Sequence, residues 1–345
     1  MRTRNGFQRA GRGRSAFSWF PPVAATLAAL LALGGCADIN VSIGLGSRDA
    51  PIAETEVLAD DNPGRNRVAM IDLRGVILDG RTPGVLGPGA NPVDAFLAKL
   101  DKAREDDSVR AIIVRISSPG GTVTASDVLY SELRRFSEET GKPIVAQLGD
   151  IATSGGYYAA LGADEIVAHP MGITGSIGVV VPTFNVADGM SSIGIRSRSV
   201  VSASNKDLAN PFEPMEEAHY AILQGMVDEM YAHFRRIVLE RRPDADRGKA
   251  ESFLDGRVFT GAHAVRLGLA DSTGGVREAF DRAKALAGID RATLVKYHDE
   301  GMLARSAYAR GQVPAADTLA LELKIPGIPE SLPTNAYYLW MPGSE

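Results

Sequence analysis

Short, almost uninterrupted apolar runs alternate with helical segments between residues 67 and 290. The run Val109–Ser117 (VRAIIVRIS) is typical of a parallel strand that is buried on both faces. A helix with one apolar face follows it and ends at Gly141. Further strands are predicted at 68–78, 143–148, 165–168, 177–181 and 196–202. This alternation predicts an α/β domain with a mostly parallel sheet and flanking helices.

The segments around this domain have a different character. A long amphipathic helix is predicted from Pro214 to Arg242 inside the domain. Residues 36–66 contain few periodic apolar positions and are interpreted as a tether. Residues 291–345 are predicted to be a proline-rich tail of undefined role that ends in Tyr337-Tyr338-Leu339-Trp340.

The amino-terminal residues resemble a bacterial lipoprotein signal. Five arginines precede an apolar run of about 11 residues, which is too short for the ~20 residues of a membrane-spanning helix. The run ends in Leu33-Gly34-Gly35-Cys36, and Cys36 is the only cysteine of the chain. We therefore expect a signal peptide at 1–35 and lipid attachment at Cys36, on the outer face of a bacterial membrane. The net charge of −5, without a basic stripe, disfavours nucleic acid as a partner.

Three glycine-bracketed segments are candidates for chemistry, because the sequence contains no zinc spacing, P-loop or dinucleotide fingerprint. We expect no metal and no cofactor. The first segment, Ser118-Pro119-Gly120-Gly121, follows a predicted strand. The amides of Gly120 and Gly121 are suited to stabilising an oxyanion, and a plain tight turn is the alternative.

The second segment, 150–160, contains Ser154 at the predicted start of a helix. Ser154 is interpreted as an N-cap residue. The alternative is a nucleophile in a triad with His169, the best placed of the five histidines.

The third segment is Thr174-Gly175-Ser176-Ile177-Gly178. The flanking glycines leave the hydroxyl of Ser176 uncrowded, as an attacking group requires. Lys206 is the candidate base, because it is the sole lysine between Lys142 and Lys249 and a lysine amine, unlike a guanidinium group, can be deprotonated. An exposed loop lysine is the alternative interpretation.

The motifs SSPGG, ATSGGYYAA, ITGSIGVV, NKDLANPFEPM and DGRVFTGAHAVRLGLAD occur in this order between residues 67 and 290. In this they resemble the signal peptide peptidase A serine peptidases, in the short form with a single repeat. The resemblance implies a ClpP/crotonase fold, Ser176 as nucleophile, Lys206 as general base, and Gly120 and Gly121 in the oxyanion hole. It also implies a ring of copies in which the serine and the lysine come from neighbouring protomers.

The predicted function is therefore a lipid-anchored serine endopeptidase that cleaves signal peptide remnants or other extended peptides. Two alternatives stay open beside the Ser154/His169 peptidase. One is a non-catalytic scaffold that binds peptides on the same fold. The other is acyl-CoA chemistry, which the predicted secretion disfavours.

Overall fold

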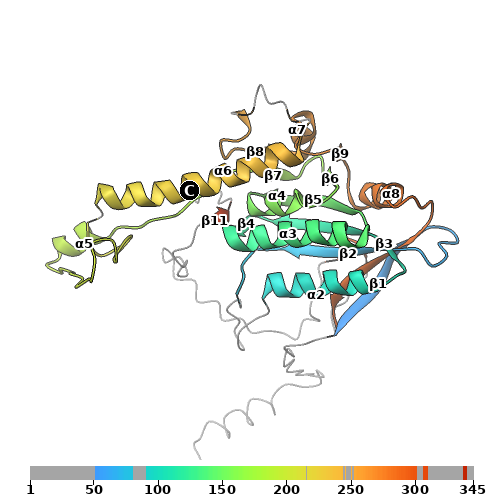
Figure 1. Ribbon diagram of the computed structural model, residues 1–345, viewed down its shortest axis with the longest axis horizontal. Helices are drawn as coiled ribbons and strands as arrows, with labels where there is room; N and C mark the ends of the chain where they lie inside the picture. The colour runs from blue at the N-terminus through green and yellow to red at the C-terminus, as the bar shows by residue number, and fades with distance from the viewer. Residues whose placement is uncertain are drawn as a thin grey trace, which may run out of the picture. The chain divides into compact units, whose positions relative to one another are not determined.

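The computed structural model describes residues 51–80, 91–214, 216–243, 245, 250, 252–300, 306–309 and 337–339. A nine-stranded sheet forms the centre of this part of the chain (Figure 1). Its strands are β1 (Ile52–Ala59), β2 (Arg67–Arg74), β3 (Val109–Ser118), β5 (Ile144–Thr153), β6 (Glu165–Ala168), β7 (Ile173–Gly175), β8 (Val258–Thr260), β9 (Ser272–Thr273) and β10 (Thr293–Asp299). The predicted signal peptide and Cys36 lie outside the described residues.

The sheet is mostly parallel. The strand order is β1-β10-β2-β3-β5-β6-β9, and β7 pairs with both β5 and β8. Only the β1–β10 and β7–β8 pairs are antiparallel in this sheet. The α/β class predicted from the sequence is therefore confirmed. Because β3 and β5 are central, their predicted continuous apolar runs are buried on both faces.

Helices cover both faces of the sheet. On one face lie α2 (Pro92–Glu105), α3 (Val123–Thr140), α4 (Gly155–Ala160) and the end of α6 (Glu217–Arg241), and these pack on the larger apolar core. The opposite face is covered by α8 (Val276–Leu286), and α7 (Gly261–Arg266) lies beside β8. Local signals set the ends of these helices. The side chain of Asn91 caps α2, and Gly141 ends α3 with φ +65°.

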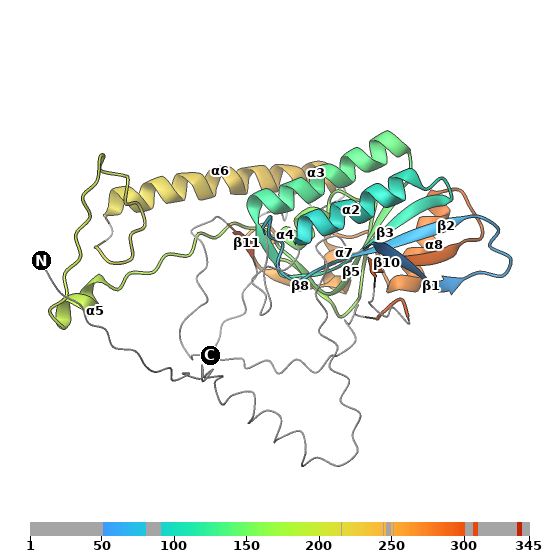
Figure 2. The same ribbon diagram turned by 90° about the horizontal axis from the view of Figure 1, so that it is seen from below.

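The helix α6 confirms the predicted long helix, but most of it does not pack on the sheet. Its buried residues, Phe234, Ile237 and Val238, all lie in its second half. Residues 182–214, which we call the arm, contain the short helix α5 (Ala187–Ser192) and lie at the other end of α6 in both views (Figures 1 and 2).

Two predicted strands are wrong. The strand expected at 177–181 is replaced by β7, which ends at Gly175, and the strand expected at 196–202 is irregular and largely exposed chain in the arm. An apolar pattern predicts a strand only where a neighbouring strand is available for pairing, and among the described residues no strand pairs with the arm.

The sheet also extends beyond the predicted domain boundaries at 67 and 290. The strand β1 lies within the predicted tether, and β10 lies within the predicted tail. These two strands pair with each other, and β10 also pairs with β2. Farther along, β11 (Tyr337–Leu339) pairs with β4 (Gly120–Thr122) in a second, two-stranded sheet.

No helix among the described residues is long and apolar enough to cross a membrane.

Candidate active site

Three of the predicted segments meet at one edge of the sheet. The strands β3, β5 and β7 are parallel, and the segments 118–121, Ser154 and Ser176 lie at or directly after their carboxyl ends. The register places Ser118 opposite Ala152, and Thr153 opposite Gly175. This edge is where parallel sheets usually carry their functional groups.

Ser154 occupies a sharp turn between β5 and α4. Its backbone angles are φ +52° and ψ −116°, a conformation that costs energy for any residue other than glycine. Ser154 stands at the N-cap position of α4, as expected, but its side chain makes no capping hydrogen bond. A strained strand-to-helix turn is a known way of presenting a nucleophilic serine.

Contacts on both sides fix this turn. A Cβ atom at Gly156 would lie 2.9 Å from the carbonyl oxygen of Ser118, so the turn packs directly against the end of β3. The two tyrosines that follow are buried, and their hydroxyls donate to the carbonyl of Leu269 and to Asp127, at 2.7 and 2.6 Å. Burial raises the pKa of Tyr157, which keeps its hydroxyl protonated as a donor. The strained conformation of Ser154 is thus held by the packing around α4.

The two amides of the glycine loop do not point outward together, as its sequence predicts, but face different partners. The amide of Gly120 donates to Oγ of Ser118 at 3.0 Å. The amide of Ile77 donates to the carbonyl of Gly120, and the carbonyl of Ile77 accepts from the amide of Thr122. Because backbone groups alternate along a strand, the N–H and C=O of Gly121 face the side opposite Ile77. Of the two predicted oxyanion donors, the amide of Gly121 is therefore the one that faces away from Ile77, on the side where β11 pairs with β4.

The same loop requires glycine at position 121. A Cβ atom there would lie 1.8 Å from the carbonyl oxygen of Ile77, closer than any side chain permits.

Ser176 is buried and also has a positive φ, +53°. Its amide donates to the carbonyl of Arg257 at 2.7 Å. It follows β7, whereas the glycine loop follows β3, and β5 lies between these two strands. Ser176 is thus one strand farther from Gly121 than Ser154 is, which corresponds to about 5 Å.

The structure does not bring either candidate base to a serine within one copy. Lys206 is exposed in a turn of the arm, where its amide bonds to the carbonyl of Ala203. His169 is exposed as well, and its Nδ1 accepts from the amide of Met171 at 3.3 Å. Among the hydrogen bonds of the described residues, none joins His169 to Ser154, and the predicted Ser154/His169 pair gains no support.

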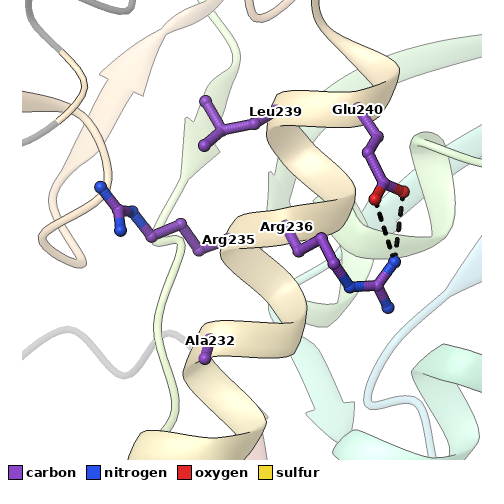
Figure 3. A pocket seen from close by; sticks show the side chains of 5 residues that line it. All are labelled: Ala232, Arg235, Arg236, Leu239 and Glu240. Carbon is purple, nitrogen blue, oxygen red and sulfur yellow. Dashed lines mark hydrogen bonds and ion pairs between the residues drawn. The ribbon is translucent and has the colours of Figure 1, made fainter.

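A cavity of about 450 Å³ lies elsewhere, along α6. Its lining residues are Ala232, Arg235, Arg236, Leu239 and Glu240, and an ion pair between Arg236 and Glu240 crosses part of it (Figure 3). Neither serine lines it, and it carries no nucleophile.

Comparison with known proteins shows the family to which the chain belongs. The model of peptidase family S49 matches residues 137–290. The protein named "Putative protease slr0021" from Synechocystis sp. is 35% identical over 226 residues, which cover 66% of this chain and 76% of that protein. Relatives also include "Putative signal peptide peptidase SppA" of Enterococcus faecium, which is 27% identical, with 71% of both chains covered. The chain is a serine peptidase, and it belongs to peptidase family S49, as the resemblance predicted.

Some relatives are much longer. Protease 4 of Haemophilus influenzae is 33% identical over 225 residues, and the chain covers only 35% of its length. Among solved structures, the 1510-N membrane-bound stomatin-specific protease is similar with a TM-score of 0.40 and 17% identity, over 64% of this chain and 85% of that one.

Proposed function

We propose that the chain is a serine endopeptidase in which Ser154 attacks the peptide carbonyl and the amide of Gly121 stabilises the oxyanion. One observation carries this choice of nucleophile: the strained turn of Ser154 packs directly against the glycine loop. The family resemblance implied Ser176, which is one strand farther away and stays the competing candidate.

The general base in this proposal is Lys206 of a neighbouring copy. Two observations support a second copy. Lys206 is exposed on an arm that lies away from the sheet, so it is not beside Ser154 or Ser176 of its own copy. The arm and the first half of α6 also hold most of the exposed large apolar side chains of the described residues: Phe184, Val186, Ile193, Ile195, Val200, Val201, Phe212, Tyr220, Ile222 and Met226. An apolar surface of this kind marks an interface.

The chemistry follows from these groups. The neutral amine of Lys206 takes the proton of Ser154 as Oγ bonds to the carbonyl carbon. The tetrahedral intermediate collapses, the C–N bond breaks, and the ammonium group returns the proton to the departing amine. Water, deprotonated by the same amine, then releases the acyl group as a carboxylic acid. No metal or nucleotide takes part.

The substrates would be extended peptides, including remnants of signal peptides. The chain would act at the outer face of a bacterial membrane, where a lipid on Cys36 holds it. This part of the proposal rests on the sequence of the amino-terminal segment and on the family resemblance.

Fluorogenic peptide hydrolysis tests the proposal with Ser154→Ala, Ser176→Ala and Lys206→Ala at the same oligomeric state. A fluorophosphonate probe, mapped by mass spectrometry, identifies the reactive serine independently. We expect activity to be lost in Ser154→Ala and Lys206→Ala and the label to fall on Ser154. Loss in Ser176→Ala with the label on Ser176 would restore the sequence prediction. A folded wild-type chain that neither cleaves nor reacts would favour the non-catalytic scaffold.

A further inference from the structure

Two buried hydroxyl groups lie at the start of the glycine loop. Ser118 and Thr153 are both buried, at the carboxyl ends of the neighbouring strands β3 and β5. A buried hydroxyl group without a hydrogen bond costs free energy, so each of these is expected to have a specific partner. Both partners belong to one peptide unit, that between Pro119 and Gly120, which we call the loop peptide.

The loop peptide is held at both of its polar atoms. The hydroxyl of Thr153 donates to the carbonyl of Pro119 at 3.2 Å, and the amide of Gly120 donates to Oγ of Ser118 at 3.0 Å. A trans peptide unit is planar, and its C=O and N–H bonds point in opposite directions. One hydrogen bond on each side therefore fixes the rotation of this plane about the line that joins its two Cα atoms.

The loop peptide is also the part of the loop that rotates most easily. The ring of Pro119 fixes the φ angle of this residue but leaves its ψ angle free. Gly120 has a φ of +106°, and it has no side chain to limit the rotation of this angle. Rotation of the plane changes only these two angles. Without the two hydroxyl groups, the backbone that leads into Gly121 would therefore have several directions open to it.

Thr153 also sets the distance between the loop and the turn of the proposed nucleophile. It directly precedes Ser154, and its partner Pro119 lies two residues before Gly121. Among the side-chain hydrogen bonds of the described residues, this is the one that joins the strand of Ser154 to the glycine loop. The other end of the loop is held by the backbone of Ile77. The amide of Gly121 thus lies between two anchors, one of which belongs to the strand that carries Ser154.

We propose that Ser118 and Thr153 are positioning residues, which hold the loop peptide so that the amide of Gly121 faces the oxygen of the carbonyl that Ser154 attacks. This inference rests on the proposed function, because it concerns the amide that this function uses. An oxyanion donor is effective when it is in place before the reaction, and a displacement of about 1 Å in a catalytic site can cost about 100-fold in rate. The two hydroxyl groups act through the loop and take no part in proton transfer.

The principal test removes the hydroxyl group of Thr153 and keeps the shape of its side chain. Thr153→Val loses the bond to Pro119, whereas Thr153→Ser keeps a hydroxyl group. A displaced oxyanion donor lowers kcat and leaves KM unchanged, because the donor acts on the transition state. For a fluorogenic peptide, at the same oligomeric state, we expect kcat to fall about tenfold in Thr153→Val with KM within about twofold. We expect Thr153→Ser to restore kcat to within about twofold of the wild-type value.

Thr140→Val is the matched control for the loss of a hydroxyl group. The hydroxyl of Thr140 also donates to a backbone carbonyl, that of Phe136 at 2.7 Å, but at the far end of α3. This variant should lower the melting temperature without a change in kcat. An equal loss of kcat in Thr140→Val and Thr153→Val would assign the effect to lost stability and overturn the inference. An unchanged kcat in Thr153→Val would overturn it as well.

Hydrogen–deuterium exchange, read by mass spectrometry over residues 117–122, tests the loop without any substrate. The variants are Thr153→Val and Ser118→Ala, which removes the acceptor of the Gly120 amide. We expect this segment to exchange about tenfold faster in both variants, and at the wild-type rate in Thr140→Val. Unchanged exchange in either variant would overturn the inference.

The two measurements separate this inference from the proposed function. Faster exchange with an unchanged kcat would show that the hydroxyl groups hold the loop but that the loop supplies no oxyanion donor, and the inference would fail. A reactive-serine label on Ser176 would refute the proposed nucleophile, whereas the effects of Thr153→Val on kcat and exchange would still uphold the positioning of the loop. A wild-type chain that cleaves no peptide would refute the proposed function, and exchange would then decide whether Ser118 and Thr153 hold the loop.

Discussion

The amide of Ser154 donates to the carbonyl of Gly175 at 2.8 Å, which places Ser154 beside Ser176 across two paired strands. Both serines have a φ close to +50°. The turn that presents one serine is thus supported by the turn that presents the other. Ser176→Ala is accordingly expected to lower activity only moderately, because it changes a neighbour of the reacting group.

Mixing two inactive variants tests whether the site is shared between copies. Ser154→Ala retains the proposed base, and Lys206→Ala retains the proposed nucleophile. In a random equimolar mixture about a quarter of the shared sites combine an intact serine with an intact lysine, so about a quarter of the wild-type activity should return. The measurement is peptide hydrolysis after subunit exchange, with exchange verified by fluorescent labels. Verified exchange without recovery would place both groups within one copy.

The arm is expected to carry the contacts between copies. Val200 is fully exposed, so Val200→Asp should leave the fold of a single copy within about 0.5 kcal/mol of its stability. It places a charge in the apolar patch and should shift the assembly toward single copies with lower activity, as measured by light scattering and hydrolysis. Met171→Asp is the matched control, because Met171 is 78% exposed but lies outside the arm. Equal effects of the two variants would remove the arm from the interface.

The glycine at position 121 has a steric role and, in the proposed chemistry, a catalytic one. Gly121→Ala brings a methyl group 1.8 Å from the carbonyl oxygen of Ile77, which must displace β4 and the amide of residue 121. We expect kcat/KM to fall at least about 100-fold, the cost of losing one oxyanion donor. Gly80→Ala is the control, since open space surrounds that position. A fully active Gly121→Ala enzyme would exclude this amide from the chemistry.

One ion pair is expected to matter for stability. Arg242 donates to both carboxylate oxygens of Asp271 at 2.9 Å, and the same carboxylate accepts from the amide of Ile166. Asp271→Ala removes the bidentate carboxylate partner of a nearly buried guanidinium group and should cost about 3 kcal/mol in the free energy of unfolding. Glu240→Ala breaks the exposed pair with Arg236 and should cost less than about 1 kcal/mol. Urea denaturation measures the loss of unfolding free energy in both variants. Similar losses would show that the pair between Arg242 and Asp271 is no more important for stability than the exposed pair.

The contact between Asp60 and Lys284, at 2.9 Å, predicts a dependence of stability on pH. Burial alone raises the pKa of Asp60, but the hydrogen bonds from Lys284 and from the amide of Ala292 bring the pKa below its usual value of 3.8. Burial alone lowers the pKa of Lys284, and the bonds to Asp60 and Asp281 bring it above its usual value of 10.5. The contribution of Asp60 is therefore lost as the pH falls below 3.8, and that of Lys284 as the pH rises above 10.5.

The variant Asp60→Asn should remove the acid-side part of this dependence. Its unfolding free energy should lie below that of the wild-type protein near pH 7, and the two should converge below pH 3.8. A constant difference across this range would show that the carboxylate charge is not the cause.

Local patterns were sufficient to predict the central strands and the helix ends. The apolar run in β3 and the stop at Gly141 each depend on a few adjacent residues, and the structure contains both. The use made of Ser154 could not be predicted in this way, because the same residue type serves as a helix cap and as a nucleophile. The backbone angles that distinguish the two uses come from the packing of Gly156 against Ser118, which is distant in sequence.

The edges of the fold were harder to predict for a similar reason. The strands β1 and β10 come from opposite ends of the domain, and each gains its place in the sheet only by pairing with the other or with β2. The apolar pattern in α6 continues through Ile222 and Met226, yet these side chains are exposed in one copy. A helical period indicates that a face is covered, but it does not distinguish the core of one copy from a contact between copies.

In the proposed chemistry, the left-handed backbone of Ser154 sets activity against stability at a single position. Glycine adopts these angles without steric cost, whereas serine pays about 1 kcal/mol or more. Ser154→Gly should therefore produce a chain that unfolds at a higher temperature and has lost its proposed nucleophile. A search for thermostable variants that measured only unfolding would select the inactive protein, so screens of this chain need a readout of catalysis at every round.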